Sequence, residues 1–404
     1  MLAVQSASAL GPFLVLPAVS RSSTSGEWAS FVFGQSLGIF VAIIVSYGWP
    51  VSGLSLVASA DPSLRRRLFV KSMVSRGILV VIVAPLVTGI AIVLVSPSDP
   101  LTAGLVAAGF TLTIGLSSGW YFVAVGSPWK NLIYGATPLL FSAVLASFLI
   151  SLGLPSAIYG VCLVVTGIGA AGCVLGFEIR PRYADFREEL RVRRVGAYLR
   201  SELPIAISQL LNAAYVALPL ALAVATLPAA ASGIYASVDR LVTLATTVIA
   251  SVGNVFQAWR AELSGFRRAH TSTFVLCGVG FTGFLFMWLL GPRFSQLLFG
   301  PDVALGPVLS VLVGAYIIVT SVRGACLRFY VIPAGRYRDA LVASAVGLGT
   351  LIILFGVQIG EVASPVSIAV TFLVAEFAAG ATQVANALAV VRRERRGGQY
   401  EDIG

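Results

Sequence analysis

The sequence predicts an all-α polytopic membrane protein with about twelve transmembrane helices in two pseudo-symmetric six-helix lobes. Of its 404 residues 57% are hydrophobic and only 11% are charged, and the mean hydropathy is +0.93. A soluble chain of this length needs far more charge on its surface. Apolar windows of about 20 residues alternate with short polar breaks, which is typical of membrane-spanning helices. The windows are continuously apolar, whereas barrel strands would alternate, so helices are favoured over a barrel.

Twelve spans are predicted, over residues 2–19, 29–49, 77–96, 102–125, 132–153, 157–177, 203–226, 232–256, 272–291, 304–327, 339–358 and 365–390. Of the 27 Lys and Arg residues, 23 fall in the loops after even-numbered spans or in the C-terminal tail. The loops after odd-numbered spans hold only Arg21 and Arg293. By the positive-inside rule, both termini are therefore cytoplasmic. No cleavable signal peptide is expected, because apolar residues follow Met1 without a basic segment.

The longest polar interval divides the chain into two halves. It carries seven Arg residues against five acidic residues. It is either a solvated linker or an amphipathic helix on the inner membrane surface, with apolar side chains toward lipid and Arg among anionic headgroups. The apolar side chains expected to face lipid are Phe186, Leu190, Val192 and Leu199. The predicted domains are an N-terminal lobe (1–177), this cytoplasmic linker (178–202), a C-terminal lobe (203–390) and a cytoplasmic tail (391–404).

A short internal repeat supports the two halves. The pattern S-G-x-aromatic-A-S opens the second span of each half, at Ser25–Ser30 and again at Ser232–Ser237. Each copy is followed by a helix that leads into a basic inner loop. Parallel repeats related by an axis along the membrane normal are a transporter architecture.

Enzyme signatures are absent from the sequence. It contains no H-E-x-x-H, P-loop or G-x-S-x-G motif, so we expect neither an enzyme with catalytic residues nor an ATP-driven pump within this chain. Four Cys in apolar segments and a single His cannot build a zinc site, and no metal or cofactor is expected beyond a coupling ion. The net charge of +10 resides in the loops, where topology explains it, so no nucleic-acid partner is expected.

Ionisable residues inside the spans are the candidates for chemistry. Asp239 and Arg240 lie about two turns into the eighth span, Arg323 in the tenth, Glu376 near the middle of the twelfth and Arg21 at the outer end of the first. A charge at the bilayer centre costs at least ~2.5–3.5 kcal/mol, so each should face the bundle interior. Adjacent helix residues are about 100° apart, so Asp239 and Arg240 are expected to need partners other than each other. These residues either form ion pairs between helices or line a path for an anionic substrate.

Several motifs, in chain order, resemble the polysaccharide (O-antigen type) flippases of the multidrug/oligosaccharidyl-lipid/polysaccharide exporter superfamily. Leu16–Arg21 followed by Gly26–Ala29 is similar to their first loop, and Ser46–Trp49 running into Ser52-Gly53 is similar to the end of their second helix. The run from Gly115 to Phe122 resembles an element of their fourth helix, and Gly233–Leu241 resembles the G-x-Y-A-x-A-D-R-L of their eighth. The chain departs from the family in lacking the usual cytoplasmic lead before the first span and in using Arg rather than Lys in its core.

The resemblance implies two six-helix lobes around a central cavity in a bacterial plasma membrane. It also implies that polyprenyl-diphosphate-linked oligosaccharide is moved from the inner to the outer leaflet for surface polysaccharide synthesis, beside membrane lipids and polysaccharide polymerase machinery. Arg240, with Arg21 and Arg323, would then line the cavity and bind the diphosphate, because Arg binds phosphate bidentately. Asp239 or Glu376 would carry the coupling ion, H⁺ or Na⁺.

Three other functions stay open, one of which is a purely structural subunit of an export complex. An ion-coupled drug or cation exporter of the same superfamily would present acids to a cationic compound, whereas basic residues outnumber acids in this core. A membrane polysaccharide polymerase or ligase would carry a long outer loop with catalytic residues, which the predicted topology lacks.

Overall fold

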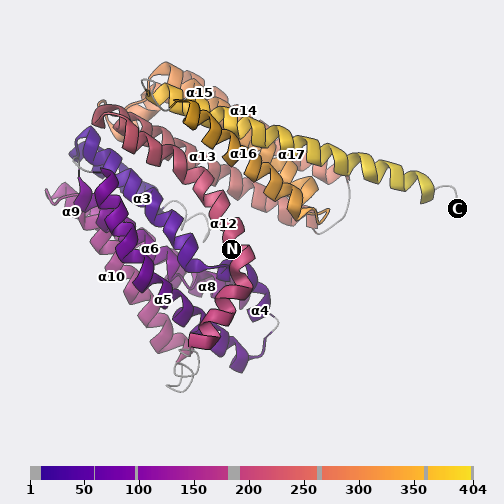
Figure 1. Ribbon diagram of the computed structural model, residues 1–404, viewed down its shortest axis with the longest axis horizontal. Helices are drawn as coiled ribbons and strands as arrows, with labels where there is room; N and C mark the ends of the chain where they lie inside the picture. Colours follow the sequence, from indigo (N-terminus) through magenta and orange to yellow (C-terminus); the bar gives the residue numbers. More distant parts are fainter. Residues whose placement is uncertain are drawn as a thin grey trace. The chain divides into compact units, whose positions relative to one another are not determined.

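The computed structural model describes residues 11–58, 60–95, 99–180, 192–261, 266–358 and 363–401, which form helices and connecting turns, without a strand among them. They divide into two compact units, Met1–Ala236 and Ser237–Gly404 (Figure 1). The division falls inside helix α13 (Ala229–Ala261), later in the chain than the predicted linker. Our lobe boundaries therefore stay a prediction.

Eleven helices within the described residues are long and apolar enough to cross a membrane. Each corresponds to one of our predicted spans from the second to the twelfth; of the first, 2–19, the described part includes helix α2 (Leu16–Ser22). The eleven candidate spans are Ser25–Ser46, Pro62–Val93, Pro100–Ala124, Pro128–Ser151, Ile158–Ile179, Gln209–Thr226, Ala229–Gln257, Arg268–Phe299, Pro307–Val331, Arg338–Val357 and Pro365–Arg393.

The first unit is a bundle in which small residues let helix backbones approach closely. A Cβ on Gly34 would lie 2.4 Å from the carbonyl oxygen of Ala103, and one on Gly160 would lie 2.4 Å from that of Leu105. Glycine is therefore required where α3 and α10 cross α6, as is typical of helix packing in lipid. Its helical elements after α2 are α3 (Ser25–Ser46), η1 (Trp49–Gly53), α4 (Leu54–Ala58), α5 (Pro62–Val95), α6 (Pro100–Gly115), α7 (Gly119–Ala124), α8 (Pro128–Asn131), η2 (Leu132–Ala136), α9 (Thr137–Ser151), α10 (Ile158–Cys173), η3 (Val174–Ile179) and α12 (Val192–Thr226).

The first copy of the repeat lies in this unit, and the glycine of the second copy packs against it. Thr24 caps α3 with a capping box, in which its hydroxyl accepts the N–H of Glu27 and the Glu27 carboxylate accepts the N–H of Thr24. A Cβ on Gly233, in the first turns of α13, would lie 2.6 Å from the carbonyl oxygen of Ser25. The small residues of the repeat therefore allow the start of α13 to touch the start of α3.

Two predicted spans differ in detail from the helices that form. The third was expected over 77–96, but α5 begins at Pro62, where Asp61 Oδ1 accepts the N–H of Leu64 at 2.8 Å. Hydropathy measures the preference of a segment for lipid, so the predicted span begins only after the basic residues. The helix itself begins before them. The fourth, expected as one helix over 102–125, is broken between α6 and α7 at residues 116–118.

The described part of the polar interval is not a separate helix. Residues 192–202 continue without a break into the seventh span as α12, while 181–191, with Phe186 and Leu190, lie outside the described residues. In the amphipathic-helix alternative Leu199 faces lipid; in the structure it is half-buried against an apolar cluster that contains Trp49, Trp120 and Tyr198. The Tyr198 ring stacks on Trp49 with centroids 4.7 Å apart.

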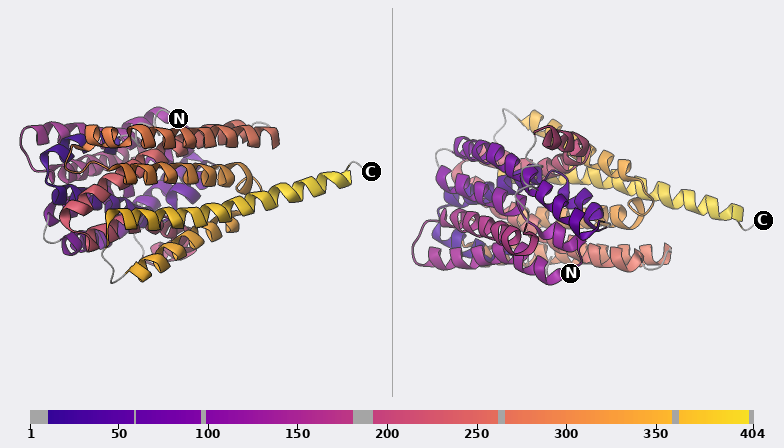
Figure 2. Two further views of the ribbon diagram at one scale, coloured as in Figure 1. Left: turned by 90° about the horizontal axis from the view of Figure 1, so that it is seen from above. Right: turned by 90° about the horizontal axis from the view of Figure 1, so that it is seen from below.

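The second unit contains the remainder of α13 with α14 (Phe266–Phe299), α15 (Pro307–Cys326), η4 (Leu327–Val331), α16 (Tyr337–Gln358) and α17 (Pro365–Glu401). Helices α14 and α15 pack together, as do α15 and α17 and α16 and α17. The residues predicted as a tail continue the helix of α17 as far as Glu401, and α17 runs past its neighbours in this unit (Figures 1 and 2).

Candidate functional site

A buried ion pair joins α15 to α17 in the second unit. Arg323 Nη1 donates to Glu376 Oε2 at 2.7 Å, and the Glu376 side chain is 0% exposed. Thr320 Oγ1 donates to the other carboxylate oxygen at 3.0 Å, and Arg323 Nη2 donates to Ser344 Oγ at 3.4 Å. The pair forms because Thr320 and Arg323 lie on one face of α15, three residues apart, toward α17. Each charge therefore has a partner of opposite sign.

Asp239 and Arg240 also form an ion pair, which corrects our expectation that they could not. Arg240 Nη2 lies 2.5 Å from Asp239 Oδ2, and Arg240 Nε donates to the same oxygen at 3.1 Å. The two Cβ atoms do point to different faces, but the long Arg side chain folds back to the short Asp. Arg240 is 3% exposed and Asp239 is 11% exposed. A buried charge without a partner costs more than the bent side chain, so the neighbours pair.

Tyr316 on α15 lies close to both pairs. It is near enough to Asp239, Arg323 and Glu376 to interact electrostatically with their charges. Its buried ring stacks on Phe372 of α17 with centroids 4.8 Å apart. Four of the five predicted site residues therefore share one region of the second unit, and each pair joins a predicted substrate-binding cation to a predicted coupling-ion acid.

Arg21 is not part of this arrangement. It lies in the last turn of α2, in the first unit, and its side chain is exposed. Arg21 belongs to the first unit and Arg240 to the second, so the lining of one path by both residues stays a prediction.

The sequence reasoning missed Arg76, which is 1% exposed in α5. Its guanidinium donates to the carbonyl oxygens of Gly115 at 3.1 Å and Ser117 at 2.8 Å, and lies 5.8 Å from the centre of the Trp120 ring. No carboxylate within the described residues forms a salt bridge with it. Arg76 satisfies carbonyls that the break between α6 and α7 leaves without helical donors. In the sequence, the Gly- and Ser-rich run at this break is the feature that could have indicated a need for such a donor.

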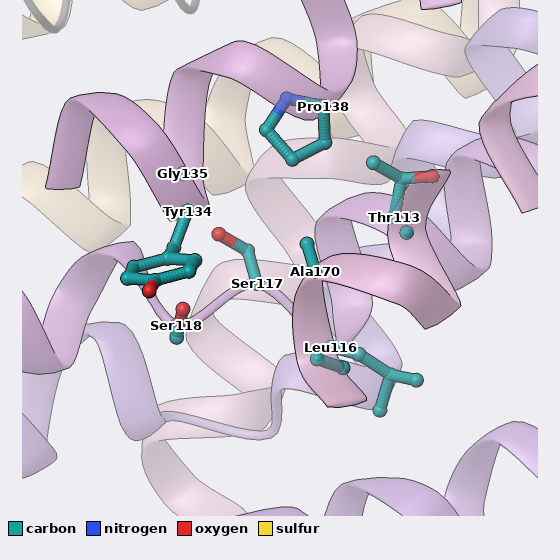
Figure 3. Close-up of a pocket in the computed structure, with 10 residues that line it drawn as sticks. Thr113, Leu116, Ser117, Ser118, Tyr134, Gly135, Pro138 and Ala170 are labelled. Carbon is teal, nitrogen blue, oxygen red and sulfur yellow. The ribbon is translucent and has the colours of Figure 1, made fainter. Parts of the chain in front are cut away.

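A small polar cavity lies beside the same break, between α6, η2, α9 and α10. It has room for about one water molecule. Figure 3 shows Ser117 and Tyr134 on one side of it and Thr113 on the other. It is too small for a sugar or a drug, so we assign it no substrate.

Metal binding has no support in the part of the chain that the structure describes. No group of three or more His, Cys, Asp or Glu side chains there could hold a metal ion. The four cysteines are free thiols, at Cys162, Cys173, Cys277 and Cys326.

Sequence comparison finds no matching family model and no matching curated protein. The structure, in contrast, is similar to solved membrane transporters. The lipid II flippase MurJ in an inward closed conformation aligns with a TM-score of 0.73 at 10% identity, covering 96% of this chain and 90% of MurJ. An inward-facing multidrug resistance MATE family transporter aligns with a TM-score of 0.66 at 14% identity, covering 98% of this chain and 99% of that transporter.

The eukaryotic MATE transporter AtDTX14 also aligns, with a TM-score of 0.53 at 15% identity over 97% of this chain and 94% of AtDTX14. The alignments run over nearly the whole chain, so they cover both compact units. The predicted fold class, an all-α polytopic membrane protein with about twelve spans in two lobes, is therefore confirmed. The chain has the fold shared by the MATE transporters and the MurJ flippase of lipid II.

Proposed function

We propose that the chain is a flippase that moves a polyprenyl-diphosphate-linked oligosaccharide from the inner to the outer leaflet of a bacterial plasma membrane. The observation that carries the proposal is the pairing of Arg240 with Asp239 beside the Arg323–Glu376 pair. A buried arginine whose partner can be exchanged suits an anionic headgroup. The fold that this chain shares with a lipid II flippase supports the same choice.

The proposed mechanism is an exchange of anions on Arg240. In the resting state its guanidinium is held by the Asp239 carboxylate. A diphosphate offers two anionic groups with oxygens that suit the guanidinium fork. When Asp239 takes up a proton or a sodium ion, it loses its hold on Arg240, and the diphosphate can replace it. Headgroup binding is then coupled to ion uptake.

In Asp239→Asn the competing carboxylate is gone, so binding of the headgroup becomes stronger and no longer depends on the coupling ion. Glu376 and Arg323 form the second pair that could exchange partners in the same way.

The test is substitution of Arg240 in the source organism. Arg240→Ala should abolish surface polysaccharide while the protein is present at its normal level, and lipid-linked glycan should accumulate on the inner leaflet. Arg240→Lys should rescue only partly, because an ammonium cannot make the bidentate fork. Arg338→Ala is the matched control, since Arg338 is exposed at the start of α16.

A purely structural pair gives a different result. In that case Arg240→Ala removes the folded protein, and the swap of Asp239→Arg with Arg240→Asp restores it along with polysaccharide. That outcome would overturn the assignment of Arg240 to the substrate.

An ion-coupled exporter of cationic compounds is the second candidate. The fully buried carboxylate of Glu376 favours it, because an acid released from Arg323 could bind a cation. Export of a lipophilic cation by the purified protein, abolished by Glu376→Gln, would support this candidate. We favour the flippase because the resemblance of the Asp239–Arg240 segment to the polysaccharide flippases adds to the geometry.

The topology and partners belong to the same proposal. Both termini lie in the cytoplasm, as the distribution of Lys and Arg indicates, and polymerase machinery receives the product at the outer leaflet.

A further inference from the structure

An apolar cavity of about 230 Å³ lies in the second unit, between α13, α14 and α15. Its α13 wall is a strip with helical spacing that runs from Leu241 to Ile249. Its lining side chains are all hydrophobic, apart from one glycine. They come from Leu241, Leu244, Ala245, Val248, Ile249, Val279, Gly283, Phe286, Met287, Phe294 and Ile317.

Small residues shape this space. Ala245 presents only a methyl group on α13. Gly283 lets Ile317 of α15 pack closely on α14, since a Cβ on Gly283 would lie 2.8 Å from Ile317 Cγ2. Val248 and Phe286 are 46% and 39% exposed, so the cavity has an open rim on the outside of the unit. A chain can therefore enter from the side.

The lining selects the chemistry of the occupant. Cavities of this size that are lined only by aliphatic and aromatic groups stay dry and bind apolar molecules. A sugar, a phosphate or a cation would lose its hydration without gaining a hydrogen bond. An aliphatic chain makes no hydrogen bonds to water, so it loses none on entering the cavity.

The cavity begins next to the charged site. Leu241 directly follows Arg240, and Ile317 directly follows Tyr316, which lies close to Asp239 and Glu376. From Leu241 to Ile249 the strip extends about 12 Å along α13, at 1.5 Å per residue. An amphiphile with its anionic group at Arg240 could therefore lay its apolar chain along this strip.

We propose that this cavity holds the part of the substrate's polyprenyl chain that adjoins the diphosphate while Arg240 holds the diphosphate. This inference rests on the proposed flippase function and deepens it. The chain stays in apolar surroundings while the headgroup is bound among charges. The cavity is then a determinant of lipid specificity, separate from the charged pair.

The test is photo-crosslinking in the full-length protein in lipid nanodiscs. The probe is a polyprenyl diphosphate that carries a diazirine on the isoprene unit next to the diphosphate. It should label peptides of α13, α14 and α15 that line the cavity. Excess polyprenyl diphosphate should suppress the labelling, whereas excess phosphatidylglycerol should not. Labelling elsewhere, or suppression by phosphatidylglycerol alone, would overturn the assignment to the prenyl chain.

Two substitutions reduce the space. Ala245→Leu fills the cavity, and Val248→Phe closes its exposed rim without disturbing buried packing. Displacing about two methylene groups should weaken labelling about tenfold. Ala345→Leu on the exposed face of α16 is the matched control and should label like the unaltered protein. Normal labelling in both cavity variants would overturn the inference.

Transport measured on the same proteins separates the two proposals. If the protein flips the lipid-linked sugar but the probe labels other helices, the cavity inference is wrong and the flippase stands. If the probe labels the cavity but no flipping occurs, the proposed function is wrong and the chain site stands.

Discussion

The stability of the second unit should depend on whether both partners of the Arg323–Glu376 pair are present or absent together, rather than on the presence of the charges themselves. Glu376→Leu leaves the Arg323 guanidinium in the interior without this carboxylate. Breaking a buried pair by removing one partner costs about 3–5 kcal/mol of the free energy of unfolding. Thr320→Val removes one hydrogen bond to the same carboxylate, which is worth about 1.5–3 kcal/mol.

The double variant Arg323→Met, Glu376→Leu removes both charges together. Apolar side chains of similar volume in place of a buried pair are neutral or stabilising by about 1–4 kcal/mol. The double variant should therefore recover most of the loss seen in Glu376→Leu. Glu376→Leu should be the least stable variant and Thr320→Val the next. The double variant should be about as stable as the unaltered protein.

Unfolding of the purified protein in mild detergent, followed by intrinsic fluorescence, gives this order directly. Arg338→Met controls for loss of an exposed Arg. A Glu376→Leu protein as stable as the unaltered one, or a double variant no more stable than Glu376→Leu, would refute the reasoning. A stable double variant that no longer transports would assign the pair to coupling rather than to folding.

Three further predictions concern packing, capping and topology. Gly34→Ala forces α3 away from α6 and should lower the free energy of unfolding by about 1–3 kcal/mol. Gly77→Ala, with open space around it, should raise the free energy of unfolding by about 0.5–1 kcal/mol. Unfolding in detergent compares the two variants. Thr24→Ala removes the cap of α3 and should lower the unfolding free energy by about 1 kcal/mol. In a cysteine-free background, an impermeant maleimide should label Leu154→Cys from outside and miss Lys130→Cys; the reverse labelling would overturn the topology.

Hydropathy predicted the spans of this chain well because lipid leaves little choice of structure. A segment of about 20 apolar residues has to be helical to satisfy its backbone in lipid. The same property does not report where a helix continues beyond its apolar stretch, which is why the start of α5 at Pro62 was missed. It also does not report a break that other groups satisfy, as Arg76 does between α6 and α7.

The candidate site was predicted as a set of residues but not as an arrangement. The cost of charge in lipid was enough to select Asp239, Arg240, Arg323 and Glu376. Their pairing depends on side-chain reach and on which helices pack together, and helical spacing alone excluded the Asp239–Arg240 pair that forms. The apolar cavity had no signal, because its lining resembles any other buried helix face.

Translocation by the purified protein tests the central claim most directly. Liposomes would contain a polyprenyl diphosphate linked to a fluorescent disaccharide in both leaflets, and an impermeant reductant would quench only the outer leaflet. With the unaltered protein, the protected fraction should become accessible much faster than in protein-free liposomes. Arg240→Ala should bring the rate back to the protein-free value and Arg338→Ala should not. A rate with the unaltered protein equal to that of protein-free liposomes, in preparations that export a lipophilic cation, would contradict the flippase assignment.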